Sequence, residues 1–443
     1  MTAALAERAR AIVGAPHLVT APDRLAEYAV DGVRPVTVAR PETAEETAAL
    51  LSAAGDAGAG VLPRGAGTHQ HLGGLPARAD LVIDTTRLVG ITDYTPADYV
   101  VAVRAGTRLR DLASELNRNT QWLPIDPPGE GASTIGGIIA ANRNGPRRLL
   151  CGSIRDMLIG IRVALPAGEV IKAGGKVVKN VAGYDLTKLF IGSLGAFGVI
   201  TEATFKISPH PGEGLTVFVT VPSLDAAHTL TTSVMRSYLL PSALEAANPP
   251  ALRRLALAAG MREPPAGAWG VLLLAEGMAE SQTRHVNEMR TLVGALGQME
   301  VLKGPPHDAL WKAVAEFPSP SSHPGGVVSR VGGPLARWAD VVRVLDAARD
   351  LAGSVEVLAH AGLGLLYAAC GDPRCGPAQA DALARAAAEI GGYAVVEVAP
   401  PEMKARLPLW GPPPGGVDLM RRLREKFDPR GIMIPGRLGW GLS

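Results

Sequence analysis

The sequence predicts an α+β protein whose first half alternates strands and helices and whose second half is an antiparallel α+β domain. Three observations predict this fold: a strand–helix–strand unit that ends in a glycine loop near residue 65, a glycine-dense tract at 125–200, and strand-plus-helix halves after residue 215. The 443 residues are 47% apolar, which is enough for about three domains with cores of their own.

The first unit begins with a β-rich run at Val36–Ala39, and Thr43 with Glu46 then forms a capping box that opens an alanine-rich helix. A short strand, Val61–Leu62, leads directly into the loop at 64–68. Further strands are expected at 81–84, 91–94, 99–104 and 197–207. Thr107 is expected to cap the next helix, and the segments 157–165 and 170–173 are expected to form a β-hairpin.

Longer segments follow in the second half, with strands expected at 215–221, 271–276 and 355–358 and helices at 224–238, 281–296 and 378–390. A proline-rich hinge at 408–416 leads to a last helix, Val417–Phe427. We therefore expect a helical lead-in at 1–30, a first domain at 31–211, a second domain at 212–407 and a C-terminal segment at 408–443.

Composition excludes several classes of protein. A net charge of only +2 offers no overall attraction for nucleic acid or an anionic bilayer. Cys151, Cys370 and Cys375 are too few for a disulfide framework and lack iron–sulfur spacing, so we expect reduced cysteines. The start of the chain lacks a secretory signal, and no stretch of about 18 apolar residues occurs. These features predict a cytoplasmic protein that meets the inner face of a membrane only peripherally, through partners.

The glycine loops are candidates for holding a phosphate group. Gly65-Ala66-Gly67 begins the dinucleotide-binding pattern G-x-G-x-x-G, but Gln70 occupies the position of its last glycine. Gly175-Lys176 resembles the end of a Walker loop, but Val170 occupies the position of that loop's first glycine. Glycine still lets several main-chain N–H groups face one anion, which suits a diphosphate. The segment 143–188 has nine Lys or Arg against three Asp or Glu, a local charge of +6. The alternative is that the glycines make tight turns only and the cations form a solvated face.

Five blocks of sequence occur in a specific order and spacing, namely Pro63–Thr68, Pro127–Gly129 with Ser133–Ala140, Gly152–Asp156, Lys179–Gly195 and Gly198–Glu202. They resemble the FAD-binding domain of the vanillyl-alcohol-oxidase/PCMH flavoproteins. With Phe427–Pro429 and Pro435–Arg437 the resemblance covers most of the chain, and it is closest to the FAD-binding, E-type subunits of bacterial glycolate oxidases. It implies a PCMH-type (type 2) FAD-binding domain of two α/β subdomains, an antiparallel α+β cap domain, and a C-terminal helix that returns to the FAD domain.

The resemblance also implies which residues bind FAD. Main-chain amides of the loop at 64–68 and of the segment 129–137 would cradle the pyrophosphate, and Ser153 and Ile200 match positions that contact FAD. The full set of expected cofactor-binding residues is Arg64, Gly65, Ala66, Gly67, Thr68, Pro128, Gly129, Ser133, Thr134, Gly136, Gly137, Ser153, Asp156, Gly198 and Ile200. Some relatives attach FAD through a histidine at the position of Thr68, so we expect FAD to be non-covalent.

Other polar residues near these loops have two interpretations each. His69 and His71 form a pair that can ligate a metal, but loop histidines without a third ligand are more typical of a surface, and no metal site is expected. Tyr184 and Asp185 are candidates for contacting flavin or substrate. The alternative that Asp185 caps a helix at 186–190 is somewhat favoured.

Flavin oxidation of a 2-hydroxy acid needs a base, a cation for the carboxylate and a C–H bond aimed at the flavin. Catalytic relatives of the D-2-hydroxy-acid branch carry the metal-binding motif His-Ala-Gly-Asp-Gly-Asn-x-His and a later Glu-His-Gly segment. In the matching stretch from His360, Leu363 and Leu365 replace the Asp and Asn, and Tyr367 replaces the second His. No Glu-His pair occurs in the sequence, and His360 is expected to be a packed, hydrogen-bonded residue at a strand end. No catalytic residue is therefore assigned.

The resemblance implies an FAD-binding subunit of a glycolate oxidase or dehydrogenase complex. Its partners would be a catalytic flavoprotein subunit and an iron–sulfur subunit, its substrate a small 2-hydroxy acid such as glycolate, and its electrons would leave to the respiratory chain. Two alternatives stay open: a self-sufficient FAD-dependent 2-hydroxy-acid dehydrogenase, and a scaffold subunit that has lost its flavin.

Overall fold

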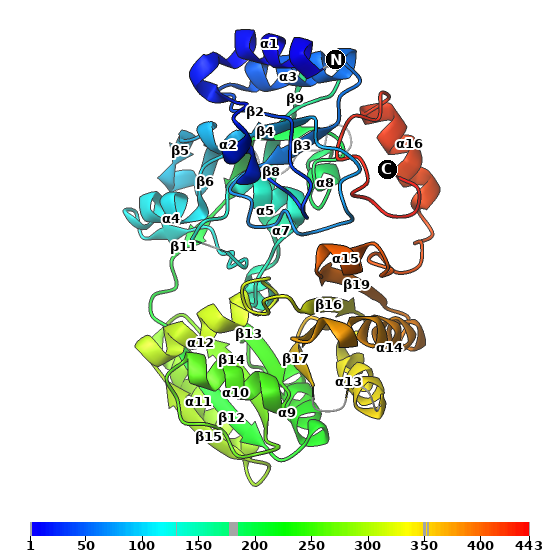
Figure 1. Cartoon of the computed structure of the whole chain (residues 1–443). Coiled ribbons are helices and arrows are strands. Elements are labelled where there is room, and N and C mark those ends of the chain that lie inside the picture. Colours follow the sequence, from blue (N-terminus) through cyan, green and yellow to red (C-terminus); the bar gives the residue numbers. More distant parts are fainter. Residues whose placement is uncertain (1, 130, 177–184, 349–350, 352–353, 443) are drawn as a thin grey trace.

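The computed structural model describes residues 2–129, 131–176, 185–348, 351 and 354–442. The chain forms two lobes, and the N-terminal half and the C-terminal tail share the upper one (Figure 1). The upper lobe holds a four-stranded and a five-stranded sheet, and the lower lobe holds one sheet of eight strands. This arrangement confirms the predicted α+β fold, whereas the predicted domain limits stay a prediction.

The first sheet of the upper lobe has the strand order β1 (Leu18–Val19), β2 (Thr37–Ala39), β4 (Leu81–Asp84) and β3 (Val61–Arg64). Its last three strands are parallel, and the helices beside it are α1 (Thr2–Val13), α2 (Pro22–Ala26) and α3 (Ala44–Asp56). Thr43 caps α3 by accepting a hydrogen bond from the Glu46 N–H. The carboxylate of Glu46 accepts the N–H of Glu42 and not that of Thr43, so only half of the expected capping box forms.

The second sheet is antiparallel and has the order β5 (Ile91–Thr95), β6 (Val100–Arg104), β10 (Val199–Lys206), β8 (Leu158–Ala164) and β9 (Val170–Gly174). The predicted β8–β9 hairpin is confirmed. The remaining elements of this lobe's first half are α4 (Leu109–Asn117), β7 (Gln121–Trp122), α5 (Ile135–Ala141), α6 (Arg148–Cys151), α7 (Ile154–Met157), α8 (Thr187–Phe190) and β11 (Ser208–Pro209). Thr107 does not cap α4, because the N-cap is Arg108 and the Thr107 hydroxyl accepts the N–H of Gly90 instead.

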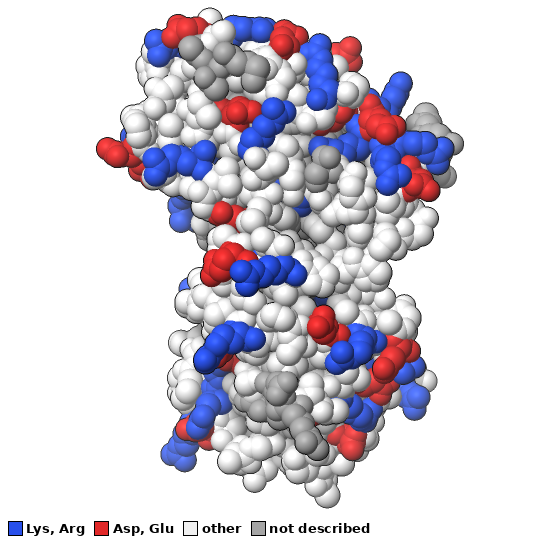
Figure 2. All heavy atoms as spheres, turned by 45° about the vertical axis from the view of Figure 1, so that its right-hand side comes forward, with Lys and Arg blue, Asp and Glu red and all other residues white. Residues whose placement is uncertain are grey.

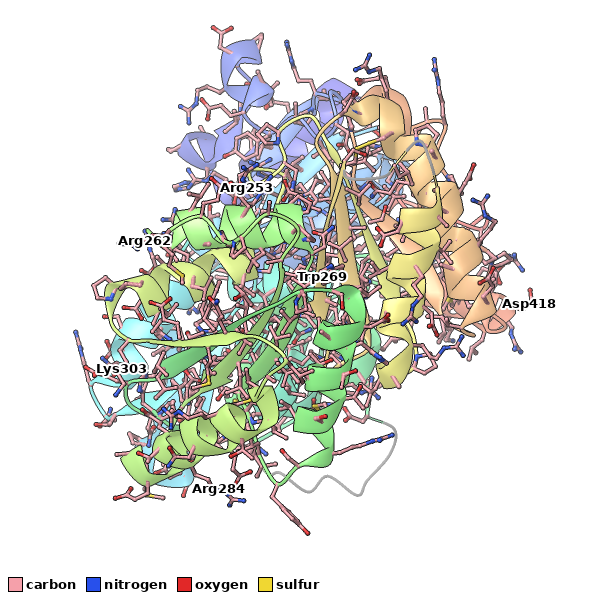
Figure 3. The ribbon with its side chains drawn as sticks, turned by 90° about the horizontal axis from the view of Figure 1, so that it is seen from below. Arg253, Arg262, Trp269, Arg284, Lys303 and Asp418 are labelled. Atoms are coloured by element: carbon pink, nitrogen blue, oxygen red, sulfur yellow. A yellow bond between two sulfur atoms is a disulfide. The ribbon has the colours of Figure 1, made fainter. Side chains whose placement is uncertain are left out.

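The lower lobe is built on the sheet β15 (Gln298–Leu302), β12 (Leu215–Val221), β14 (Trp269–Ala275), β13 (Ala243–Ala247), β17 (Val355–His360), β18 (Leu365–Cys370), β16 (Val327–Gly332) and β19 (Tyr393–Val398). Its helices are α9 (Leu224–Arg236), α10 (Pro249–Ala258), α11 (Ala279–Val293), α12 (Pro305–Glu316), α13 (Trp338–Ala347), α14 (Gly376–Glu389) and α15 (Pro401–Lys404). Seen from below, Arg262, Arg284 and Lys303 lie at the outer edge of the view, whereas the buried Trp269 lies toward its middle (Figure 3). All described strand pairs of this sheet are antiparallel, as predicted.

The end of the chain returns to the upper lobe and lies against β3. After α16 (Val417–Phe427), the main-chain oxygen of Ile432 accepts the N–H of Val61 at 2.8 Å, and the N–H of Ile434 donates to the Val61 oxygen at 2.8 Å. The carboxylate of Asp428, which is 3% exposed, accepts the N–H groups of Ile432 and Met433. The tail therefore holds the strand from which the glycine loop leaves.

Charged side chains of both signs adjoin one another on both lobes of the face seen in Figure 2, and the described surface contains many ion pairs between them. None of the helices among the described residues has the length and apolar character that a membrane crossing needs.

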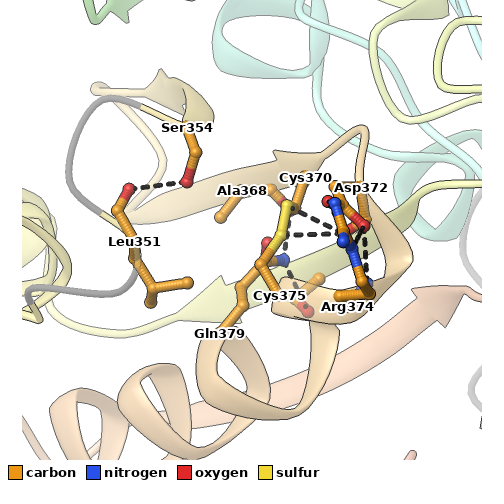
Figure 4. The surroundings of a disulfide bond; sticks show 9 residues. Leu351, Ser354, Ala368, Cys370, Asp372, Arg374, Cys375 and Gln379 are labelled. Atoms are coloured by element: carbon orange, nitrogen blue, oxygen red, sulfur yellow. Dashed lines mark hydrogen bonds and ion pairs between the residues drawn. A yellow bond between two sulfur atoms is a disulfide. The ribbon is translucent and has the colours of Figure 1, made fainter.

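The expectation of reduced cysteines is wrong for two of the three. Cys370 at the end of β18 and Cys375 form a disulfide, with their Cα atoms 6.6 Å apart, next to the Asp372–Arg374 ion pair (Figure 4). The 3₁₀ turn Pro373–Cys375 brings the second sulfur back to the first, which spacing alone did not suggest. Cys151 is free.

Replacing Asp428 by Asn should lower the free energy of unfolding by about 2 kcal/mol, because one of two buried N–H groups loses its charged acceptor. Urea unfolding followed by circular dichroism measures the change. Asp418→Asn is the matched control, because Asp418 lies in the first turn of α16, whose C-cap is Asp428, and its side chain is 89% exposed; it should change stability by less than about 0.5 kcal/mol. Equal effects of the two substitutions would contradict this role of Asp428.

Candidate functional site

The glycine loop that follows β3 leaves several main-chain donors free. Within the described part of the chain, the N–H groups of Ala66, Gly67 and Thr68 make no hydrogen bond. Gly67 has a φ of 82°, a left-handed conformation that favours glycine. A Cβ built on Gly65 would lie 2.0 Å from the Thr134 hydroxyl oxygen, so only glycine fits where the two segments meet. Consecutive free amides in such a turn form a nest for an anion.

A cavity lies against this loop, and its empty space, including the part open to solvent, is about 640 Å³. Ten of the predicted cofactor-binding residues line it, namely Arg64, Gly65, Ala66, Gly67, Thr68, Thr134, Gly136, Gly137, Gly198 and Ile200. They come from the loop after β3, from α5 and its N-cap, and from the start of β10. The fold thus brings together segments that are far apart in the sequence, since Arg64 and Ile200 are separated by about 135 residues.

The donors of this cavity fit a negatively charged dinucleotide. The hydroxyl oxygen of Thr134 is buried without a partner among the described residues. The Arg64 guanidinium lies 4.9 Å from the centre of the Tyr28 ring and forms no ion pair within the described part of the chain. One free guanidinium, one free hydroxyl and three free amides provide what a diphosphate requires.

The other five predicted residues do not line the cavity. Ser133 lies behind the loop, where its hydroxyl is 3.0 Å from that of Thr68 and donates to the Gly129 oxygen at 2.7 Å. The Gly129 N–H donates to Glu316 of the lower lobe at 2.6 Å. Ser153 and Asp156 form the capping box of α7. Pro128, next to Gly129, lies outside the cavity wall as well, and a contact of these five residues with a cofactor stays a prediction.

His69 and His71 are part-buried and face inward, which corrects the expectation that they lie at the surface. His69 lines the cavity. Burial, with the charge of Arg143 as the second cause, lowers the pKa of His69 well below its ordinary value and that of His71 to about 3. Both rings are therefore neutral at pH 7. Among the described residues, no group of three His, Cys, Asp or Glu side chains is arranged to hold a metal.

A second cavity, with about 500 Å³ of empty space, lies between the lobes and shares Ala141 with the first. Its upper wall includes Arg143 and its lower wall includes Arg330 on β16 and Glu397 on β19. Arg143 Nη1 donates to Glu397 Oε2 at 2.6 Å, and Arg330 Nε donates to Glu397 Oε1 at 2.6 Å. This carboxylate thereby joins the two lobes.

Glu397 is held in its ionised form by these two arginines. Burial alone would raise the pKa of Glu397, but the charges and hydrogen bonds of Arg143 and Arg330 outweigh burial and lower the pKa to about 2. The same pairing raises the pKa of both guanidiniums against the opposing effect of burial. All three groups are charged at neutral pH.

The segment that matches the relatives' metal motif lines this second cavity. His360 ends β17 and is 6% exposed, so its expected packed position is confirmed. Its Nδ1 lies 2.6 Å from Oε2 of the buried Glu245, but neither atom makes a hydrogen bond among the described residues, so the expected hydrogen bond is not found there. Leu363, Leu365 and Tyr367 line the same wall. The side chains at these positions present apolar surface and one phenol to the cavity.

The described residues of the basic segment, 143–176 and 185–188, do not line the first cavity. Arg147 is bonded to Glu276 of the lower lobe and to Asp126, and the Lys188 ammonium donates to main-chain oxygens. Asp185 accepts the Thr187 N–H at 3.1 Å just before α8, but the N-cap of this helix is Leu186, so Asp185 bonds the first turn without being its N-cap. Lys179 and Tyr184 lie outside the described residues. Much of the predicted local charge is therefore neutralised by ion pairs.

Sequence reasoning missed three contributions to the two cavities. Leu194 and Gly195 line the first one, and Gly195 has a φ of 89° with Pro63 packed where a Cβ would stand. Gly195 is the last residue of the recognised block Lys179–Gly195, so the available signal in the sequence was a glycine at that position. The pairing of Arg143 with Glu397 had none, because the two residues are 254 positions apart.

Comparison with known proteins agrees with this geometry. The profile of the family described as "FAD binding domain" matches residues 35–174, and that of "FAD linked oxidases, C-terminal domain" matches 211–399 and 410–438. Two solved structures share the fold. Alkyldihydroxyacetonephosphate synthase has a TM-score of 0.75 and 15% identity, and the match covers 98% of this chain and 86% of the synthase chain. p-Cresol methylhydroxylase has a TM-score of 0.73 and 16% identity, and the match covers 98% of this chain and 96% of the hydroxylase chain.

Three curated relatives are similar in sequence. Glycolate oxidase subunit GlcD of Bacillus subtilis (strain 168) is 28% identical over 91% of this chain and 89% of its own length. Glycolate oxidase subunit GlcE of Escherichia coli (strain K12) is 43% identical, but over only 29% of this chain and 37% of its own length. A D-lactate dehydrogenase of Anaerostipes hadrus is 33% identical over 49% and 46%.

Replacing Gly65 by Ala should weaken FAD binding by at least about tenfold, because the new methyl group displaces Thr134 from the cavity wall. FAD affinity measured by flavin fluorescence tests this. Gly131→Ala is the matched control, since a Cβ there meets nothing within 4 Å, and it should leave the affinity unchanged. An unaltered affinity in the Gly65 variant would exclude the proposed role of the loop.

Replacing Glu397 by Gln should destabilise the protein by about 3 kcal/mol at pH 7, because two buried guanidiniums lose their common counter-ion. The lowered pKa means that this stabilisation is complete above the ordinary value of 4.5 and is lost as the pH falls from there to about 2. Urea unfolding of wild type and variant should therefore converge in acid. The exposed Glu402→Gln substitution is the control, and it should change the free energy of unfolding only slightly at every pH. A difference in unfolding free energy between wild type and Glu397→Gln that stays constant down to pH 3 would contradict the role of Glu397 as counter-ion.

Proposed function

Since the chain is an FAD-binding flavoprotein of the vanillyl-alcohol-oxidase/PCMH superfamily and an FAD-linked oxidoreductase, we propose that it is the FAD-carrying subunit of a complex that oxidises glycolate or a related 2-hydroxy acid. When bound, FAD accepts the two electrons that such an oxidation releases. The observation that carries the proposal is the pair of adjoining cavities, one with free donors for FAD and one between the lobes. The similarity to glycolate oxidase subunits supports it.

The residues of the first cavity would bind FAD without a covalent bond. The amides of Ala66, Gly67 and Thr68 would hold the diphosphate, and Arg64 would neutralise its charge. Thr68 offers no imidazole for attachment, and its hydroxyl is already bonded to Ser133. The Thr134 hydroxyl disfavours a flavin-free scaffold, because a buried hydroxyl without a partner costs stability unless a ligand uses it.

The second cavity supports the subunit role. Its leucines at 363 and 365 cannot ligate a metal or accept a proton, and His360 is tied to Glu245. A catalytic flavoprotein subunit would then carry out most of the alcohol oxidation, and an iron–sulfur subunit would take the electrons. We propose an E-type subunit, on the strength of the higher identity in the segment shared with GlcE, although the resemblance to GlcD covers more of the chain. Membrane contact would be peripheral and through these partners.

A second candidate is a self-sufficient 2-hydroxy-acid dehydrogenase. Buried cations beside the FAD cavity favour it, since a substrate carboxylate needs a positive partner. The resemblance to a D-lactate dehydrogenase supports it as well.

Anaerobic titration of the FAD-loaded chain with glycolate and D-lactate separates the candidates. Alone, the chain should bleach at least about a hundredfold more slowly than after mixing with the catalytic partner subunit, which carries its own flavin. After mixing, the loss of absorbance should exceed that of the partner alone. Rapid bleaching of the isolated chain would establish the second candidate, and failure to bind FAD would overturn both.

A further inference from the structure

The disulfide between Cys370 and Cys375 presents one of its two cysteines to solvent and buries the other. Cys370 ends β18 and is 1% exposed, whereas Cys375 is part-exposed and is the N-cap of the helix α14. Figure 4 shows the bond between the end of the strand and the start of this helix. Exchange of a disulfide requires that a thiolate reach one of the two sulfurs, so Cys375 Sγ is the accessible point of attack.

The position of Cys375 also favours its thiolate form. The helix α14 runs from Gly376 to Glu389, so the Cys375 side chain lies at the N-terminal end of 14 helical residues. The partial positive charge at such an end stabilises a thiolate, which makes Cys375 both a better leaving group and a better nucleophile at neutral pH. The neighbouring Arg374 is ion-paired with Asp372, so we assign this effect to the helix.

The structure around the disulfide has support of its own. The cross-link joins residues only five positions apart, and a loop so short restricts the unfolded chain little. Gln379 of α14 is 0% exposed, and its Nε2 donates to the Ala368 oxygen at 2.9 Å and to Ser329 Oγ at 3.2 Å. Leu383 of the same helix belongs to the core of the lower lobe. Opening the disulfide therefore leaves α14 attached to the sheet.

The reduced form of the pair has an acceptor in place. The main-chain oxygen of Asp372 lies 3.1 Å from Cys370 Sγ and 2.9 Å from Cys375 Sγ. A thiol S–H is a weak donor, so each thiol of the reduced pair can donate to this oxygen. The same local backbone thus accommodates the closed and the open state.

We propose that Cys370–Cys375 is a thiol–disulfide exchange site, at which a thiol reductant, either glutathione-like or a protein dithiol, attacks Cys375 Sγ. The attacking thiolate forms a mixed disulfide with Cys375, and the bond to Cys370 breaks and releases the Cys370 thiolate. A second thiolate then attacks the reductant's sulfur and releases Cys375. The pair gains two electrons, the reductant becomes a disulfide, and its thiols supply the two protons. This inference goes beyond the proposed function and does not depend on it.

Thiol trapping of the FAD-loaded full chain tests the proposal. One arm uses about 5 mM reduced glutathione and the other uses reduced thioredoxin, so the two arms distinguish the sources of thiol. Mass spectrometry of alkylated peptides should find Cys370 and Cys375 opened together in at least one arm, and closed again after the reductant is removed. Circular dichroism and FAD content should stay unchanged. A disulfide that opens in neither arm until urea unfolds the chain, or a chain that unfolds on reduction, would overturn the proposal.

Single substitutions test which sulfur is attacked. Cys370→Ser leaves Cys375 free, and oxidised glutathione should form a mixed disulfide with it at least about tenfold faster than with Cys151. Cys151 is the internal control, because burial raises its pKa to about 11. Cys375→Ser leaves the buried Cys370, which should react at least about a hundredfold more slowly than Cys375 does in the first variant. Equal rates for Cys370 and Cys375 in the folded variants, or a Cys375 no faster than Cys151, would overturn the assignment.

Discussion

The close approach of the Gly65 main chain to Thr134 is the constraint on which the rest of the structure depends. It brings the loop after β3 against the N-cap of α5, and no side chain fits between them. Gly136 packs in the same way against Ala105, where a Cβ would come within 2.8 Å of the alanine methyl group. The free amides of the loop face the cavity because these contacts fix the turn. The C-terminal tail supports the arrangement by holding β3 through Val61.

The second determinant is a buried charge cluster between the lobes. Glu397 binds guanidiniums from the upper lobe and from β16, so it acts as counter-ion and as a joint between lobes. Burying these charges is unfavourable unless every charged group has hydrogen-bond partners. Arg143 Nε and Nη2 have none among the described residues, so the cluster contributes less to stability than a fully paired one would. The two sites share a wall, so a ligand in one lies close to the cofactor in the other.

The parts of the fold that could be predicted from sequence are local. The glycine loop can be located because clustered glycines follow a strand directly, and the β8–β9 hairpin can be located because its turn lies between two β-rich segments. β13, with the sequence Ala-Leu-Glu-Ala-Ala, was missed because it lacks β-branched residues and is a strand only through its position in the sheet. The prediction that Thr107 caps the helix α4 is wrong by one residue, because the N-cap is Arg108. The Arg143–Glu397 pair depends on how the lobes meet, which no local pattern encodes.

A crystal structure of the chain grown with FAD tests the central claim most directly. The account predicts the diphosphate within hydrogen-bonding distance of the amides of Ala66, Gly67 and Thr68, beside the Thr134 hydroxyl, with no covalent bond between the ring and the protein. A diphosphate bound elsewhere, or a loop that moves away to leave its amides in solvent, would contradict it.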